Sequence, residues 1–294
     1  MIPGAAVDHQ IYALPTIKTN AVEYFQAAGY EVFCVTHWMG KTPNAQRGYT
    51  AYDARLDILA SFEEIHRIHC SEQPIYVISH CMGSIALSAG LLDGTIKSAW
   101  IKGLTTSQVF FNPIAGTVNK LKAASPVPLT RVYRLLAGNW FSCISTENDT
   151  LVQRLFNQVL LWTHKRLNAA THDNLSKFLG GITMRALELL MFTGTHGYVV
   201  NNNRESLVTP ANLQCLQGMP ILFISGGENV VFSPEGTDKS FTTLTAVFAL
   251  KDYEREVFDG YGHLDCWMGS QASKDVYPTV LAHAEKTYID NFTG

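Results

Sequence analysis

The stretch that decides the fold runs from Pro74 to Ser84 and reads Pro-Ile-Tyr-Val-Ile-Ser-His-Cys-Met-Gly-Ser. Its first six residues form an apolar, β-rich run that predicts a buried parallel strand, and residues 83–92 predict a helix. Between them Cys81 has a small residue two positions before it, Ser79, and another two positions after it, Gly83. This spacing is typical of a nucleophile on a tight strand-to-helix turn. We therefore predict that Cys81 is a nucleophile, and that the following helix N-terminus favours its thiolate form. The alternative is a small, inert, buried cysteine.

A second motif, Gly260-Tyr-Gly-His263-Leu-Asp265, follows a predicted last strand over residues 253–258. A histidine in a loop at the carboxyl end of a parallel strand can reach the same edge of the sheet as Cys81. We predict that His263 is the base that partners Cys81. The alternative is a histidine in a surface loop.

A third motif, Gly226-Gly-Glu228-Asn229, follows a predicted strand over residues 220–225, where the orienting residue of a catalytic triad usually stands. Counting from Gly226 puts Asn229 at the position of the acid. A cysteine–histidine pair can work with asparagine as its orienting group. We favour Asn229 for this role and keep Glu228 and Asp265 as alternative acids, while all three are also common as turn and helix-cap residues.

Outward from these motifs, strands alternate with helices, which predicts parallel β-α-β units and a doubly wound α/β core. From about Thr105 to Gln217 the pattern is mainly helical, so we predict a helical lid or cap at 105–217 inserted into a core made of 1–104 and 218–294. Further predicted strands cover 31–36 and 97–104, and further predicted helices cover 17–28, 53–69, 234–249 and 276–288.

The composition excludes several classes of protein. The chain has 294 residues, of which 47% are apolar and 16% charged, with a net charge of -3, so it lacks the basic surface of a nucleic-acid-binding protein. No apolar run is long enough to span a membrane, and the first residues do not resemble a signal peptide. The six cysteines form no C-x-x-C pair, which indicates reduced thiols and a cytoplasmic protein. We expect neither cofactor nor metal, and spare apolar surface for a pocket or for a contact in a homo-oligomer.

The Cys81 turn, the order Cys81, Asn229, His263 and the helical insertion resemble the α/β-hydrolase superfamily over nearly the whole chain. Residues 79–84 and 260–267 are closest to the cysteine-containing hydrolase modules associated with GMC-type, cholesterol-oxidase-like oxidoreductases. The cysteine is also similar to that of dienelactone hydrolases.

This resemblance implies an oxyanion hole. Residues 3–9 resemble the oxyanion loop of the superfamily, and the resemblance implies that the backbone N–H groups of Met82 and of Ala5 or Ala6 stabilise the oxyanion. The strand that should precede this loop is missing from the pattern, because only two residues stand before it. The sequence offers no account of how the sheet compensates.

We therefore expect a thiol hydrolase or acyl transferase of the esterase, thioesterase or lactonase type. Aromatic residues of the insertion, with Trp140, Phe141 and Trp162 foremost, would roof a cleft for a bulky apolar acyl or polyketide-like substrate, although ordinary helix packing explains each of them equally well. Two alternatives stay open. One is a lyase, isomerase or cyclase on the same fold, and the other is a non-catalytic binding module.

Overall fold

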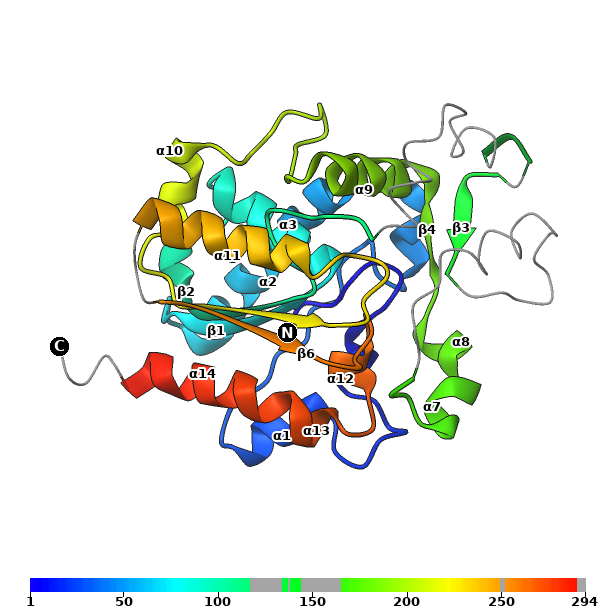
Figure 1. Ribbon diagram of the computed structural model, residues 1–294, viewed down its shortest axis with the longest axis horizontal. Coiled ribbons are helices and arrows are strands. Elements are labelled where there is room, and N and C mark those ends of the chain that lie inside the picture. The colour runs from blue at the N-terminus through cyan, green and yellow to red at the C-terminus, as the bar shows by residue number, and fades with distance from the viewer. Residues whose placement is uncertain (117–133, 137, 144–164, 249–251, 290–294) are drawn as a thin grey trace.

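The computed structural model describes residues 1–116, 134–136, 138–143, 165–248 and 252–289. Its centre is a parallel sheet with the strand order β1-β2-β5-β6 (Figure 1). The four strands are β1 (Ile75–His80), β2 (Ile101–Ser107), β5 (Ile221–Gly226) and β6 (Tyr253–Phe258). Each coincides with a predicted strand to within four residues, and the parallel α/β prediction is confirmed.

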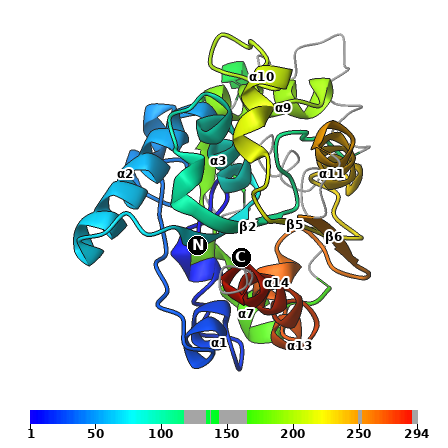
Figure 2. The ribbon, with the colours of Figure 1, turned by 90° about the vertical axis from the view of Figure 1, so that its left-hand side faces the viewer.

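Helices cover both faces of the sheet, so the molecule has three layers (Figures 1 and 2). The helices on one face are α2 (Ala51–His69), α3 (Met82–Leu92) and α11 (Glu235–Phe248). Those on the other face are α1 (Ala21–Ala27) and α14 (Tyr277–Ile289). Helix α1 begins four residues later than predicted, because Asn20 and Glu23 form a capping box at its start.

Adjacent residues of β1 and of β5 belong to two different hydrophobic clusters. Val77 and Phe223 pack in the cluster that contains residues of α2 and α3, whereas Ile78 and Leu222 pack in the cluster that contains residues of α14. This follows from the alternation of side chains along a strand. Because both faces are covered, β1 and β5 begin with apolar runs that the sequence reveals, whereas β6 at the edge reads Tyr-Glu-Arg-Glu-Val-Phe.

At the edge of the sheet beside β1, Met1 and Ile2 lie where the sequence pattern lacks a strand. Ile2 pairs in parallel with Ser79, accepting a hydrogen bond from His80 N–H (3.0 Å) and donating one to the Ile78 carbonyl (2.8 Å). On its other side the Met1 nitrogen donates to the Phe33 carbonyl (2.6 Å), and Val35 N–H donates to Met1 (2.9 Å). Two residues thus fill the position between β1 and residues 33–35. The predicted strand at 31–36 is not a regular strand in the structure, although Phe33 and Val35 both hydrogen-bond Met1.

The described part of the predicted insertion contains helices and a short antiparallel pair of strands, β3 and β4. The first residues of this range belong to the central sheet, since β2 continues to Ser107. Phe110 and Phe111, which follow, are fully buried in the main core. The elements not yet named are β3 (Trp140–Ser142), β4 (Gly181–Thr183), α7 (Ala169–Asp173), α8 (Leu175–Phe178), α9 (Met184–His196), α10 (Pro210–Leu213), α12 (Asp265–Met268) and α13 (Ala272–Asp275).

Among the described residues, no helix combines the length and the apolar character that crossing a membrane requires.

Candidate active site

Cys81 stands alone between β1 and α3 in a strained backbone conformation. Its φ is 54° and its ψ is -123°, a region that residues with a side chain rarely adopt. The Cys81 N–H donates to the Ser107 carbonyl (3.0 Å), which fixes the turn against the end of β2. The sharp turn predicted from residues 79–84 is therefore present.

The small residues around Cys81 are required by the packing of the N-terminal loop. A Cβ on Gly83 would lie 2.3 Å from the Pro3 carbonyl oxygen, and a Cβ on Gly4 would lie 2.9 Å from the Cβ of Cys81. Ser79 is fully buried and accepts a hydrogen bond from the Ser84 hydroxyl (3.0 Å). The loop thus lies directly on the turn, as the resemblance implied.

Two backbone amides hydrogen-bond the Cys81 thiol, those of Met82 and Ala5. The Ala6 N–H donates instead to the Met39 carbonyl (2.9 Å), so of the two loop residues predicted for an oxyanion hole only Ala5 directs its amide to the Cys81 thiol. Ala6 also has a positive φ, 60°, which turns the chain at this point.

Burial sets the protonation of the thiol. Desolvation raises the pKa of Cys81 to about 12, although the two amides act in the opposite direction. The Met82 N–H at the start of α3 lowers the pKa of the thiol, in the direction predicted for the helix terminus, but the loss of water around the sulfur has the larger effect.

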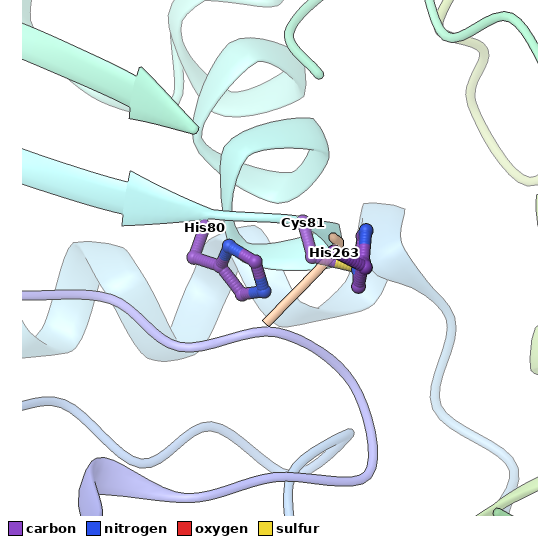
Figure 3. Close-up of side chains that lie close together, drawn as sticks. All are labelled: His80, Cys81 and His263. Carbon is purple, nitrogen blue, oxygen red and sulfur yellow. The ribbon is translucent and has the colours of Figure 1, made fainter. Parts of the chain in front are cut away.

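His263 follows β6 and precedes α12, and it is 3% exposed. Its Nδ1 lies 3.2 Å from Asn229 Oδ1, which can only accept, so Nδ1 carries the proton and Nε2 keeps its lone pair. A side-chain nitrogen of His263 and the Cys81 sulfur lie within 4.8 Å of each other (Figure 3). Burial lowers the pKa of His263 to about 3. Cysteine and histidine therefore meet as a neutral pair.

Asn229 is held in one orientation by its neighbours. Its Oδ1 also accepts from Val231 N–H (3.0 Å) and Phe232 N–H (3.2 Å). Its Nδ2 donates to Gln108 Oε1 (2.8 Å), an oxygen that also accepts from Gly226 N–H (3.0 Å). Because a backbone N–H fixes that oxygen of Gln108, Asn229 must present its NH2 to Gln108 and its carbonyl oxygen to His263.

Gln108 is a residue that the sequence analysis missed. It is fully buried, follows β2 at a positive φ of 74°, and donates from Nε2 to Cys266 Sγ (3.3 Å). The sequence pattern predicts that this strand ends at residue 104, four residues before Gln108. In the structure β2 ends at Ser107, so Gln108 directly follows the strand.

The two alternative acids have other contacts. Glu228 forms an ion pair with Lys165 (2.8 Å) and is 38% exposed. Asp265 accepts from Gly262 N–H (2.7 Å), and burial raises the pKa of its carboxyl group to about 6. The structure thus brings Asn229, rather than either carboxylate, to the Nδ1 of His263.

A second histidine, His80, lies beside the pair and was also missed. It is fully buried, its Nδ1 is 3.3 Å from Ser107 Oγ, and its ring centroid is 4.9 Å from that of His263. Burial and, to a lesser extent, His263 lower the pKa of His80 well below 6.5. Its position directly before Cys81 was the signal that could have identified it.

The predicted substrate residues are only partly covered by the structure. Phe141 in β3 is 5% exposed and packs in the same hydrophobic cluster as Cys81. Trp140 precedes it in the same strand, and a Cβ on Gly181 would lie 2.6 Å from its ring. Trp162 lies outside the described residues.

A cavity of about 550 Å³ is found elsewhere in the fold. It is lined by residues of β1, α1, α2 and α14, among them Val77, Phe25, Phe62 and Tyr288, and by none of the site residues. It is therefore separate from the candidate active site.

Solved structures of other proteins share the architecture of this chain. No family model matches the sequence, and no curated protein matches it either. Among solved structures, a soluble variant of monoglyceride lipase from Saccharomyces cerevisiae, in complex with a substrate analog, has a TM-score of 0.65 at 14% identity, covering 97% of this chain and 85% of that one. A monoacylglycerol lipase from Paleococcus ferrophilus has a TM-score of 0.58 at 14% identity, covering 97% and 92%. The α/β hydrolase GrgF from Penicillium sp. sh18 has a TM-score of 0.56 at 12% identity, covering 97% and 89%. The chain therefore has the α/β-hydrolase fold.

Proposed function

We propose that this protein is an acyl hydrolase or acyl transferase in which Cys81 is the nucleophile, His263 the base and Asn229 the orienting group. The observation that carries the proposal is the proximity of these groups at the carboxyl edge of one sheet, with the Cys81 sulfur and a His263 nitrogen within 4.8 Å and the amides of Met82 and Ala5 directed at the sulfur. α/β-hydrolase neighbours that include lipases support ester chemistry at a coarse level.

In the proposed reaction the sulfur of Cys81 attacks an ester, thioester or lactone carbonyl while its proton passes to Nε2 of His263. The backbone N–H groups of Met82 and Ala5 stabilise the oxyanion that forms. Collapse of this intermediate breaks the bond to the alcohol or thiol, which leaves with the proton from His263. Water or an acceptor alcohol then attacks the thioester on Cys81, again giving its proton to His263. Collapse of this second intermediate breaks the bond to the Cys81 sulfur, which takes the proton back from His263 as the acyl product departs.

The neutral state of the pair makes His263 a general base rather than one half of a stored ion pair. Charge separates only when the carbonyl is in place to receive the electrons. Asn229 holds the ring in the tautomer that leaves Nε2 free to accept the proton.

Substrate preference and location complete the proposal. We propose a bulky apolar acyl substrate under a lid formed by part of 105–217, with Trp140 and Phe141 near the cleft. We also propose that this chain is related to the hydrolase modules associated with GMC-type oxidoreductases. All six cysteines are free, which fits a reducing, cytoplasmic environment.

The test is acyl transfer to Cys81. A panel of aryl esters and acyl thioesters is incubated with the wild type, Cys81→Ala and the control Cys70→Ala, which removes an exposed thiol. We expect turnover and an acyl mass increase in the wild type and in the control, and neither in Cys81→Ala. His263→Gln should slow both formation and hydrolysis of the adduct. Turnover unchanged in Cys81→Ala would rule out covalent catalysis by this residue.

A second candidate is a lyase or isomerase that moves protons at the same site. It is favoured by the two buried, neutral histidines beside Cys81, which could exchange a proton with a bound substrate. It predicts solvent deuterium in the recovered substrate without an acyl adduct.

A further inference from the structure

Three side chains with metal-binding atoms meet at the end of β1. One ligand atom from each of His80, Cys81 and His263 lies within 4.8 Å of the others, and all three residues are buried (Figure 3). In tetrahedral zinc sites with ordinary bond lengths, such atoms are roughly 3.3–3.6 Å apart. Since 4.8 Å is the upper limit of the three separations, they exceed the zinc-site values by at most roughly 1.2–1.5 Å, and we infer that side-chain rotation closes this gap when an ion binds.

The two histidines are already held in the way that metal-binding histidines are held. Nδ1 of His80 meets Ser107 Oγ (3.3 Å), and Nδ1 of His263 meets Asn229 Oδ1 (3.2 Å). Ser107 Oγ is itself fixed by a hydrogen bond from Trp267 Nε1 (3.0 Å). Histidines that ligate metals through one nitrogen commonly donate from the other to an oxygen, which fixes both tautomer and ring orientation. Both rings can therefore offer Nε2 to an ion.

One of these nitrogens lacks a partner. Nε2 of the fully buried His80 makes no hydrogen bond to any described residue. A buried polar atom of this kind is costly and requires an explanation. His66 Nε2 is also unpartnered, but its ring packs against Phe62 and Trp100, and within the described residues it belongs to no cluster of three potential metal ligands.

We propose that His80, Cys81 and His263 form a binding site for a divalent transition metal ion of the Zn²⁺ type, and that the bound ion blocks the nucleophile. On binding, the Cys81 thiol releases its proton to solvent, and its sulfur and the two Nε2 atoms each give an electron pair to the ion. Water takes the fourth position. A thiolate and two imidazoles suit Zn²⁺ and Co²⁺ and disfavour Mg²⁺ and Ca²⁺, which prefer oxygen ligands.

The test uses the full chain, stripped of metal with a chelator and kept reduced. Co²⁺ is titrated while the near-ultraviolet thiolate-to-cobalt charge-transfer band and the visible bands of tetrahedral cobalt are recorded. The Zn²⁺ affinity is then measured by competition with a chromophoric chelator. We expect one ion per chain, a charge-transfer band that Cys81→Ala abolishes, and Zn²⁺ affinity at least about tenfold weaker in His80→Gln and His263→Gln.

Two further kinds of variant decide how the result is read. Ser107→Ala keeps all three ligands but removes the support of His80, and should weaken Zn²⁺ about tenfold. His66→Gln and Cys70→Ser remove a comparable buried histidine and an exposed thiol elsewhere, and should bind as the wild type does. Circular dichroism checks that each variant is folded, and Ser107→Ala provides the test should His80→Gln fail to fold.

Wild-type affinity in Cys81→Ala, or in both His80→Gln and Ser107→Ala, would overturn the proposal. The readouts need no substrate, so their failure is distinct from failure of the proposed acyl chemistry. If both hold, Zn²⁺ should inhibit acyl turnover at the concentration at which it binds, and a chelator should restore turnover.

Discussion

The replacement Asn229→Asp tests whether the site is built for an amide. The carboxylate keeps the acceptor that faces His263, Val231 and Phe232. Its second oxygen, however, takes the place of Nδ2 and lies 2.8 Å from Gln108 Oε1, so that two acceptors face each other. A flip of Gln108 would relieve this contact but turn its NH2 toward Gly226 N–H, now 3.0 Å from the oxygen. Either arrangement leaves a buried polar group without a partner.

An unpartnered buried group costs about 1–3 kcal/mol, which for a chain of this size lowers Tm by roughly 2–5 °C. The loss should depend on pH. When the introduced carboxyl group is protonated, it can donate its O–H to Gln108 Oε1 as the amide did, so folding raises its pKa above the unfolded value of about 3.9. Such a group contributes stability below the unfolded pKa and loses it as pH rises through the folded pKa. The deficit of Asn229→Asp should therefore be smallest near pH 4 and largest near pH 8.

Urea unfolding of the wild type, Asn229→Asp, Gln108→Met and the double variant, at both pH values, measures the effect as a double-mutant cycle. Without Oε1 at position 108 the introduced carboxylate no longer faces an acceptor, so the cycle should show a coupling of at least about 1 kcal/mol at pH 8. An Asn229→Asp protein as stable as the wild type at pH 8, or additive effects of the two replacements, would refute the fixed orientation of the amide.

Three other predictions follow from the same geometry. Alkylation by iodoacetamide at pH 7 should be slower at Cys81 than at the exposed Cys70 and should accelerate only at alkaline pH, which peptide mapping measures and which equal rates at pH 6 would contradict. Asn229→Ala should lower kcat more than Glu228→Gln does, because only the former releases the His263 ring; steady-state kinetics with the better ester substrate would show the opposite order if the carboxylate were the partner. For aryl esters kcat/KM should rise a few-fold per added methylene, from about 0.8 kcal/mol each, and Trp140→Ala should flatten the series; a series already flat in the wild type argues against an apolar cleft.

The sequence predicted those parts of the site that depend on strand order. Cys81 and Asn229 follow strands that the sequence marks by their apolar residues, whereas His263 follows the edge strand β6, which reads Tyr-Glu-Arg-Glu-Val-Phe. Parallel strands end at one edge, so motifs far apart in the sequence could be placed together from the order of the strands alone.

The sequence failed where polar residues are buried. Strand β2 was ended at Leu104 because Thr105, Thr106 and Ser107 follow, yet all three are fully buried with their hydroxyl groups in hydrogen bonds, such as Thr106 to the Val109 carbonyl (2.6 Å). With the strand predicted to end at Leu104, Gln108 is not recognised as the residue that directly follows β2. Such hydroxyls are satisfied by tertiary contacts that no local pattern records.

The effect of burial on the pKa of Cys81 is hidden from the sequence for a related reason. A helix N-terminus can be recognised in sequence, whereas the removal of water by a loop from the far N-terminus of the chain cannot. At the edge of the sheet, Ile2 pairs with Ser79 although the two residues lie far apart in the chain. No pattern in the sequence predicts this pairing.

Burial of the neutral pair is compatible with catalysis because of where the charges would appear. Attack by Cys81 creates a negative oxygen and a positive imidazolium together, in a region of low dielectric where each interacts strongly with fixed dipoles. The amides of Met82 and Ala5 already lie on the sulfur, and Asn229 Oδ1 already accepts from the ring that becomes positive. These dipoles need no reorganisation at the moment of reaction, which is the condition under which hydrogen-bond donors stabilise a transition state most. A site that keeps Cys81 and His263 uncharged until a carbonyl arrives thus reserves its electrostatic interactions for the transition state, and it spares the resting thiol from water-soluble electrophiles.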